Sequence, residues 1–367
     1  MNKIICQPPI LQCPLAKSGG EKSRGEKSRG KVIGMILRSF LLSKSIGLLL
    51  FINSLFVIPA FAQSSSFSNL IIFGDSISDT GNAAFIDLPF PFFENRISNG
   101  PIAVDLIANA LNLSSERSGH LLGNIEGFNY AVVGGNIEGS DPEDMNQQVD
   151  AYLDRVDQQA ESDALYVLIM GGNDLRDIRG ITNPSQATQR ISSAVIELER
   201  QIERLVAAGA RAFFVTNVPN VGRIPETLER VSTDPDIVSR AEGYVREYNV
   251  VFEQAMTSFR QRSDLSFVTF DFFAAFENVL DNGLSLGFSN TTEGCFDIDG
   301  PTIELECIIL GFESRVFFDS VHPSSAASLI VGNQMIAALP PFPLPEQPIA
   351  PPLGTSIIVP IIQLLLD

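Results

Sequence analysis

The chain carries a candidate nucleophile, Ser76, directly after a short apolar run. Ser76 lies in Gly-Asp-Ser-Ile-Ser-Asp-Thr-Gly-Asn, residues 74–82, which follows the apolar residues 70–73. A serine hydroxyl is a weak nucleophile at neutral pH unless a base accepts its proton. The 367-residue chain has only two histidines, His120 and His322, so few side chains can be that base.

His322 is the better candidate for the base because a carboxylate lies close to it in the sequence. Asp319 precedes it by three residues in Phe-Phe-Asp-Ser-Val-His-Pro-Ser, residues 317–324. One turn of chain can hold the Asp319 carboxylate against one ring nitrogen of His322, which leaves the other nitrogen free to take a proton from Ser76. His120 has no carboxylate beside it in residues 118–123 and is predicted to be a surface-loop residue.

Two further segments offer the hydrogen-bond donors that an oxyanion hole needs. Asn173 lies in Gly-Gly-Asn-Asp, residues 171–174, and carries an amide N–H. Gly134 and Gly135 lie in Asn-Tyr-Ala-Val-Val-Gly-Gly-Asn, residues 129–136, where the backbone can approach a substrate closely. Each segment alone also has an ordinary interpretation as a turn, a helix cap or a loop. The prediction of chemistry therefore rests on their combination.

These segments follow apolar runs that have the pattern of buried strands. The runs are short, rich in β-forming residues and followed by Gly, Asn, Asp or Pro, and they cover residues 70–73, 165–170, 212–216 and 267–270. Between them, apolar residues at three- and four-residue steps predict helices over 102–113, 186–208, 235–262 and 323–339. Alternating strands and helices predict one α/β domain over residues 68–339 with a parallel sheet covered on both faces. Ligands of such sheets bind beyond the carboxyl ends of the strands.

The blocks and their order resemble the GDSL lipase/esterase family, within the wider SGNH hydrolases. Residues 96–101, Arg-Ile-Ser-Asn-Gly-Pro, also resemble a segment that follows the first block in that family. The resemblance implies a flavodoxin-like three-layer α/β/α fold and a catalytic triad of Ser76, Asp319 and His322. It also implies an oxyanion hole formed by the backbone N–H groups of Ser76 and Gly134 and by the side chain of Asn173.

The sequence departs from the family pattern at two positions. Ile77 replaces the usual Leu, and Val133 replaces a small residue before the glycine, which leaves Gly134 and Gly135 both open as the donor. The chain contains no Gly-x-Ser-x-Gly motif, so an α/β-hydrolase site is disfavoured.

The predicted function is a secreted serine ester hydrolase that forms an acyl-enzyme on Ser76 and needs no metal or cofactor. The alternative is a non-catalytic surface or carbohydrate-binding relative, which is expected to have lost members of the set that this chain retains: Ser76, Asn173, Asp319 and His322. A metal-dependent hydrolase is disfavoured because two distant histidines cannot form a His-rich ligand set. The run at residues 297–300 resembles the start of a calcium loop, but Ile308 occupies the position of the closing Glu, so a turn is predicted instead.

The substrate remains open between short esters, lipids and acetylated polysaccharides. Several phenylalanines follow the first block, and they are interpreted either as an acyl pocket or lid or as ordinary packing of a loop: Phe85, Phe90, Phe92 and Phe93. No prediction is made for the oligomeric state.

The N-terminal residues have the pattern of a targeting segment. Arg38 and Lys44 precede the apolar residues 46–58, and Ala60-Phe61-Ala62 follow, so residues 35–62 are predicted to be a signal peptide cleaved after Ala62. The apolar run is shorter than the roughly 20 residues that span a bilayer, so a membrane anchor is disfavoured. Residues 1–34, with their tandem Glu-Lys-Ser-Arg-Gly repeat, are interpreted as a doubtful extension before a true start at Met35.

The charge also divides at this boundary. The whole chain has 25 basic and 43 acidic residues, but residues 63–367 contain 16 arginines, no lysine and 41 acidic residues, a net charge of -25. So negative a surface disfavours nucleic acid and anionic lipid as partners. Cys295 and Cys307 are the only cysteines after residue 62, and one disulfide is predicted, with two free thiols as the alternative. Residues 340–367 form a Pro-rich and then apolar tail, too interrupted to span a membrane.

Overall fold

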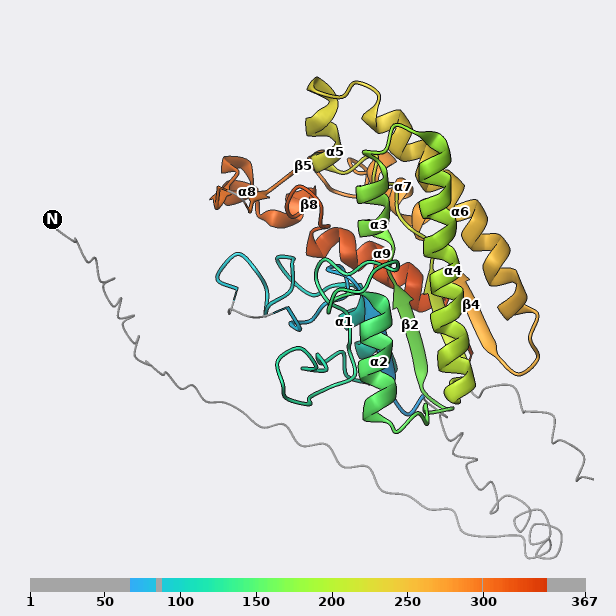
Figure 1. Cartoon of the computed structure of the whole chain (residues 1–367). Helices are drawn as coiled ribbons and strands as arrows, with labels where there is room; N and C mark the ends of the chain where they lie inside the picture. The colour runs from blue at the N-terminus through green and yellow to red at the C-terminus, as the bar shows by residue number, and fades with distance from the viewer. Residues whose placement is uncertain (1–66, 84–87, 299, 342–367) are drawn as a thin grey trace, which may run out of the picture. The chain divides into compact units, whose positions relative to one another are not determined.

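The computed structural model describes residues 67–83, 88–298 and 300–341 (Figure 1). All the described residues belong to one compact unit. The predicted extension at 1–34 and signal peptide at 35–62 lie outside the described residues, as do Phe85 and all but the first two residues of the tail. Within the described residues, no helix is both long and apolar enough to cross a membrane.

A parallel sheet forms the centre of the domain. Its strands are β1 (Leu70–Gly74), β2 (Leu165–Ile169), β3 (Ala212–Thr216) and β4 (Ser266–Phe270), hydrogen-bonded in that order. Every residue of β1, β2 and β3 is buried, because their apolar side chains on both faces are covered by helices. The predicted α/β fold with a central parallel sheet is confirmed.

A fifth stretch of backbone runs beside β1 on the side away from β2. The N–H of Ile72 donates to the Phe128 carbonyl at 3.1 Å, and the Tyr130 N–H donates to the Ile72 carbonyl at 2.7 Å. The Val132 N–H donates to the Gly74 carbonyl at 3.1 Å, just before the chain reaches Gly134. Counted with this stretch, the strand order is that of flavodoxin-like sheets, whose ligands bind where the order reverses, here between β1 and β2.

The helices pack in two groups on opposite faces of the sheet (Figure 1). One group is α1 (Ala103–Leu111), α7 (Phe272–Asp281) and α9 (Ser325–Ala337), and it meets the face that carries Ile169. The other is α2 (Met145–Arg155), α4 (Pro184–Ala208) and α6 (Ile237–Arg260), and its Tyr152 packs against Phe73 on the opposite face. Four of these helices match predicted ranges to within two residues at either end.

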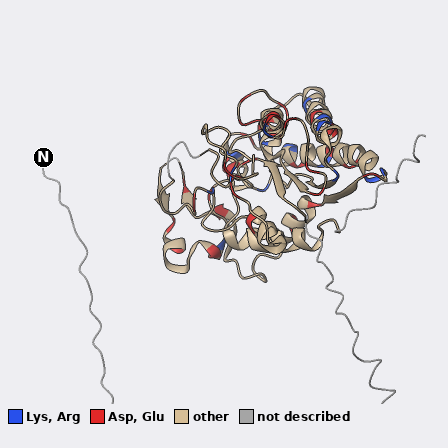
Figure 2. Cartoon of the chain, turned by 90° about the horizontal axis from the view of Figure 1, so that it is seen from below, with Lys and Arg blue, Asp and Glu red and all other residues tan. Residues whose placement is uncertain are grey.

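The acidic charge is distributed over the domain with the arginines among it (Figure 2). Many arginines are paired with nearby carboxylates, as in Arg200–Glu197 and Arg246–Glu242 on single helices. Exposed pairs of this kind contribute less than about 1 kcal/mol each, so they limit repulsion more than they stabilise the fold.

A small subdomain precedes the His322 loop. Strand β5 (Asn290–Gly294) pairs with β8 (Arg315–Phe317), and β6 (Phe296–Asp297) pairs with β7 (Thr302–Ile303). A disulfide joins Cys295 to Cys307 in α8 (Leu305–Leu310), with the two Cα atoms 5.7 Å apart. The Gly300 N–H donates to the Asp297 side chain at 3.2 Å, which forms a turn inside this disulfide loop.

Candidate active site

The structure brings Ser76 and His322 into direct contact although 246 residues separate them. Ser76 follows the end of β1, and His322 lies in the loop between β8 and α9. The Ser76 Oγ and His322 Nε2 atoms are 2.7 Å apart. Both side chains lie at the carboxyl edge of the parallel sheet, where the strand pattern predicted the site.

Asp319 holds the other side of the His322 ring. Its Oδ1 and Oδ2 atoms lie 2.9 and 2.8 Å from His322 Nδ1. Its Oδ1 also accepts the backbone N–H groups of Val321 at 2.8 Å and His322 at 2.7 Å. Because a carboxylate only accepts, Nδ1 carries the proton of the neutral ring, and Nε2 is left as the acceptor facing Ser76.

Asp319 remains ionised in this position. Burial by itself raises the pKa of its carboxyl. The charge of His322 and the hydrogen bonds from His322 and Val321 have a larger effect in the opposite direction, so the pKa lies below its usual value. A carboxylate held in this way can orient an imidazole and stabilise its charged form.

The two glycines of the second block differ in what surrounds them. Gly134 has a φ of +86°, and a Cβ at this position would meet no atom within 4 Å, so its backbone borders open space. At Gly135 a Cβ would lie 2.5 Å from the Glu143 carbonyl oxygen, and the Gly135 N–H already donates to Val132 at 3.1 Å. The geometry therefore favours Gly134 over Gly135 as a free donor.

Asn173 lies in the first turn of α3 (Gly172–Ile178), directly after β2. One amide hydrogen on its Nδ2 donates to the Gly135 carbonyl at 3.0 Å, and its Oδ1 accepts from Arg176 Nη1 at 2.8 Å. Arginine only donates, so the Oδ1 atom must face it, and this fixes the orientation of the amide. The second hydrogen on Nδ2 remains for another acceptor.

Three buried carboxylates support these loops. Burial raises the pKa of Asp75 to about 6 and that of Asp174 to about 7. Asp174 accepts the N–H groups of Ile137 and Glu138 at 2.9 and 3.1 Å, which attaches the second block to α3. Burial also raises the pKa of Asp79, which accepts several backbone N–H groups of its own loop.

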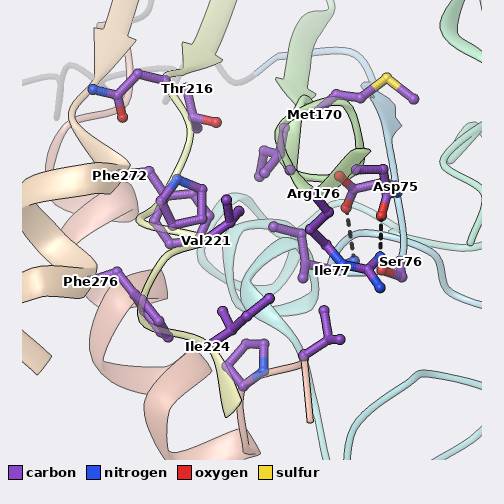
Figure 3. A pocket seen from close by; sticks show the side chains of 17 residues that line it. Asp75, Ser76, Ile77, Met170, Arg176, Thr216, Val221, Ile224, Phe272 and Phe276 are labelled. Atoms are coloured by element: carbon purple, nitrogen blue, oxygen red, sulfur yellow. Dashed lines mark hydrogen bonds between the residues drawn. The ribbon is translucent and has the colours of Figure 1, made fainter. Parts of the chain in front are cut away.

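An apolar pocket opens beside Ser76 (Figure 3). Asp75, Ser76 and Arg176 lie on one side of it, and the opposite side is formed by Val221, Ile224, Phe272 and Phe276. The pocket thus has a polar edge that carries Ser76 and an apolar wall opposite it.

Phe90, Phe92 and Phe93, the described phenylalanines after the first block, do not line this pocket. Phe92 packs against Phe296 and Phe318, with ring centroids 5.3 and 5.4 Å apart, and Phe93 lies under Arg96. Phe90 is 78% exposed and its ring meets Phe312. For Phe92 and Phe93 these contacts agree with packing of the loop, whereas the exposed Phe90 leaves both interpretations open.

His120 lies in a loop, as expected, but its side chain is half-buried. Its Nδ1 contacts the Ser118 Oγ at 2.6 Å and its ring packs 5.4 Å from that of Tyr130. Burial lowers the pKa of His120 to about 4, so the ring is neutral at ordinary pH. The sequence alone did not indicate this burial, because it depends on how the loop packs against Tyr130.

The sequence also gave no sign of Arg176 and Glu226. Glu226 lies in α5 (Pro225–Glu229) and binds Arg176 through two oxygens, at 3.0 and 3.1 Å. The only available signal was the three-residue step from Asn173 to Arg176, which places both on one side of a helix.

A parallel α/β sheet with a serine, a glycine, an asparagine and a histidine at its carboxyl edge defines the SGNH hydrolase class. The family model described as GDSL-like Lipase/Acylhydrolase matches residues 70–335, and the chain belongs to this family. The predicted family and the predicted enzyme class, a carboxylic ester hydrolase, are thereby confirmed.

Several curated proteins are similar over most of the domain. A GDSL esterase/lipase from Arabidopsis thaliana is 24% identical, covering 76% of this chain and 88% of the relative. The protein named inactive GDSL esterase/lipase-like protein 25, from the same plant, is 25% identical over 77% of this chain and 72% of its own length. The thermolabile hemolysin of Vibrio parahaemolyticus is 27% identical over 75% of this chain and 64% of its own length.

Solved structures give a weaker likeness. A catalytic mutant of an acetylxylan esterase from Geobacillus stearothermophilus aligns with a TM-score of 0.40 and 16% identity, over 74% of this chain and 95% of that chain. An aryl esterase from M. smegmatis aligns with a TM-score of 0.37 and 13% identity, over 74% of this chain and 99% of that chain.

Proposed function

We propose that this protein hydrolyses carboxylic esters through an acyl-enzyme formed on Ser76. The observation that carries the proposal is the 2.7 Å contact between the Ser76 hydroxyl and His322 Nε2, with Asp319 bound to the opposite ring nitrogen. This arrangement supplies a nucleophile, a base and an orienting carboxylate in hydrogen-bonded series.

The reaction has two stages. The Ser76 oxygen attacks the ester carbonyl carbon while its proton passes to His322 Nε2, and His322 then gives that proton to the departing alcohol. Water next attacks the acyl-enzyme carbonyl while His322 accepts a proton from it. The bond between the acyl carbon and Ser76 Oγ then breaks, His322 returns the proton to Ser76 Oγ, and the carboxylic acid leaves. Asp319 stays ionised throughout and stabilises the imidazolium form of His322.

The negative oxygen of each tetrahedral intermediate lies among three donors. These are the backbone N–H groups of Ser76 and Gly134 and the second amide hydrogen of Asn173. The open space at Gly134 and the fixed amide of Asn173 support this assignment. Donors that are already oriented stabilise the charge without reorganising, and each contributes about 10² to 10³ in turnover.

The acyl group is proposed to enter the apolar pocket beside Ser76. The side chains of this wall, Phe272, Phe276 and Val221, are apolar and carry no charge. Uncharged acyl groups of short and medium length are therefore expected to bind there better than acyl groups that carry a charge. The net charge of -25 after residue 62 favours neutral or cationic substrates over anionic ones.

The protein is also proposed to be exported. The predicted signal peptide supports this, and so does the Cys295–Cys307 disulfide, because disulfides persist mainly in oxidising compartments. N-terminal sequencing of the mature protein is expected to begin at Gln63, and a mature N-terminus upstream of residue 35 would contradict both the cleavage site and the proposed start.

A non-catalytic relative is the competing proposal, since one similar protein bears the name inactive. The deciding experiment is hydrolysis of p-nitrophenyl butyrate by the wild type and by Ser76→Ala. We expect the variant to lose activity by at least about 10³-fold while keeping the wild-type melting temperature. Ser258→Ala, an exposed serine on α6, is the matched control. An inactive wild type, or an active Ser76→Ala, would reject the proposal.

A further inference from the structure

Glu226 connects the two halves of the site from outside the pocket. Its carboxylate binds Arg176, whose Nη1 donates to the side-chain oxygen of Asn173 at 2.8 Å. Its backbone N–H donates to the Ser320 carbonyl at 2.9 Å, and Ser320 is the residue after Asp319. One residue thus contacts the support of an oxyanion donor and the loop that carries Asp319 and His322.

The carboxylate of Glu226 is itself firmly held. Arg179 donates to it at 2.6 Å and to the hydroxyl of Thr227 at 2.7 Å, and the Arg179 side chain is only 2% exposed. Burial raises the pKa of Glu226, but the hydrogen bonds from Arg176 and Arg179 outweigh it and lower the pKa to about 2. Glu226 is therefore charged at neutral pH, and three arginines, Arg176, Arg179 and Arg230, hold its carboxylate.

Arg176 needs this partner in order to stay in place. A long side chain has many rotamers, and two parallel hydrogen bonds to one carboxylate select a single orientation of the guanidinium. With Glu226 neutral, Arg176, Arg179 and Arg230 would face one another without the charge that now binds all three. Arg176 would then be free to leave Asn173 for water.

The Asn173 amide depends on Arg176 in turn. Arg176 excludes the flipped amide, because a flip would turn the Nδ2 donors toward a guanidinium. A positive charge at Oδ1 also polarises the amide and strengthens the N–H that remains for the oxyanion.

We propose that Glu226 is a positioning residue, which holds the Asn173 donor through Arg176 and in register with the Asp319–His322 loop. The inference rests on the proposed function, since it concerns the oxyanion of that reaction. Its effect belongs to the transition state, because only there does the carbonyl oxygen carry the charge that Asn173 meets.

A double-mutant cycle on p-nitrophenyl butyrate tests the proposal. Glu226→Gln keeps the backbone bond to Ser320 and removes the charge. It is expected to lower kcat by roughly ten-fold with little change in KM, a fraction of the roughly 10²–10³ lost with a whole donor. In an Asn173→Ala background the same change is expected to have almost no further effect, since residues that act through one another are not additive.

The controls separate this role from general stabilisation. Glu197→Gln removes an Arg-paired carboxylate of nearly the same exposure, 21% against 20%, on the outer helix α4, and is expected to leave kcat unchanged. If Glu226→Gln does not fold, Arg176→Lys replaces it in the cycle. It keeps a charge but not the double hydrogen bond, and the same dependence on Asn173 is expected.

The outcomes are distinct. An equal loss of kcat in both backgrounds, an unchanged kcat, or a change confined to KM would overturn the role of Glu226. Retained activity of Ser76→Ala, measured in the same panel, would instead overturn the proposed function.

Discussion

Asp79 accepts the backbone N–H of Val133 at 3.0 Å, so the loop that carries Ser76 also holds the loop that carries Gly134. The same carboxylate accepts the N–H groups of Gly81 and Asn82 at 2.6 and 2.7 Å. A buried carboxylate with so many backbone donors fixes the spacing between the proposed nucleophile, Ser76, and the proposed oxyanion donor, Gly134, which lie far apart in the sequence.

Replacement of Asp79 by Ala is therefore expected to affect both stability and turnover. Several buried N–H groups lose their acceptor, and one such loss costs about 1–3 kcal/mol in the free energy of unfolding. The remaining folded enzyme is expected to show a lower kcat, because Gly134 is no longer held. Urea unfolding and steady-state kinetics measure the two effects. Asp105→Ala, a carboxylate bound to Arg96 instead, is expected to cost stability alone.

Replacement of Asp319 by Asn tests the orientation of His322. The Asn side chain can keep an oxygen for the N–H groups of Val321 and His322, so the fold should survive. Its NH₂ group would then face Nδ1 as a donor, so the ring proton would lie on Nε2 and His322 could not accept the proton of Ser76. In comparable triads the wrong tautomer lowers kcat by about 10⁴. A kcat within ten-fold of the wild type, with an unchanged melting temperature, would remove Asp319 from the proposed triad.

Asp174 is expected to make the protein more stable as the pH falls from 8 toward 5. Burial raises its folded pKa to about 7, above the usual 3.8 of the unfolded chain. As the pH falls, the folded state therefore binds a proton at Asp174 before the unfolded chain does. Above pH 7 the buried charge of Asp174 destabilises the folded state, and this destabilisation is removed as the pH falls from about 7 to about 4. Asp75, with a folded pKa of about 6, acts in the same direction.

Several other groups oppose this trend, His120 and Glu226 among them, so the measurement must isolate Asp174. The pKa of His120 is lowered to about 4, which removes stability as the pH falls below about 6.5, and the lowered pKa of Glu226 removes stability below about 4.5. The contributions of His120 and Glu226 cancel in the difference in melting temperature between Asp174→Asn and the wild type, because both proteins contain these residues. We expect that difference to move in favour of the wild type as the pH is lowered from 8 to 5. A difference that does not change with pH would contradict the raised pKa.

The sequence predicted the sheet because continuous apolar runs of four to six residues are decisive when both faces are buried. It did not predict the stretch beside β1, because Asn129 interrupts the apolar pattern there. The structure shows why an amide is tolerated: Asn129 Nδ2 donates to the Ser78 carbonyl at 2.7 Å and to the Thr80 hydroxyl at 3.0 Å. Helix α2 was missed for a similar reason, since only a narrow apolar stripe of a polar segment faces the core.

The site was predictable where chemistry limits the residue type. A base for Ser76 had two candidates in the whole chain, and a neighbouring carboxylate distinguished His322 from His120. Arg176 and Glu226 could not be found in this way, because an arginine and a glutamate 50 residues apart are common in any acidic chain. Only the folded arrangement brings their side chains together behind Asn173.

Removal of the disulfide is expected to lower stability without abolishing turnover. The bond closes a loop of 12 residues, and loops of about this length contribute about 3 kcal/mol. The backbone contacts that attach this subdomain to the Asp319–His322 loop do not need the sulfur atoms. In one of them the Cys295 N–H donates to the Phe318 carbonyl at 3.0 Å. Cys295→Ser/Cys307→Ser is therefore expected to melt at a lower temperature with a kcat near that of the wild type at 25 °C. An unchanged melting temperature would contradict the bond.

Phe276 is expected to limit the length of the acyl group. A second, apolar cavity lies behind the pocket beside Ser76, between α7 and α9, and the two share Phe276, Phe272 and Ile77 in their walls. Phe276 is buried, and its replacement by Ala removes the ring between the cavities. We expect the ratio of kcat/KM for p-nitrophenyl octanoate over acetate to rise several-fold, at a cost of about 3–5 kcal/mol in stability.

The specificity and the stability of Phe276→Ala can be separated with a second variant. Phe259→Ala removes an equally buried ring on α6, packed against Phe267 on the other face of the sheet, and is expected to destabilise without changing the acyl preference. Because a ratio of two substrates on one enzyme is independent of the fraction folded, the comparison holds even for a weakened variant. If both variants shift the ratio alike, or neither does, the acyl chain does not enter the space between α7 and α9.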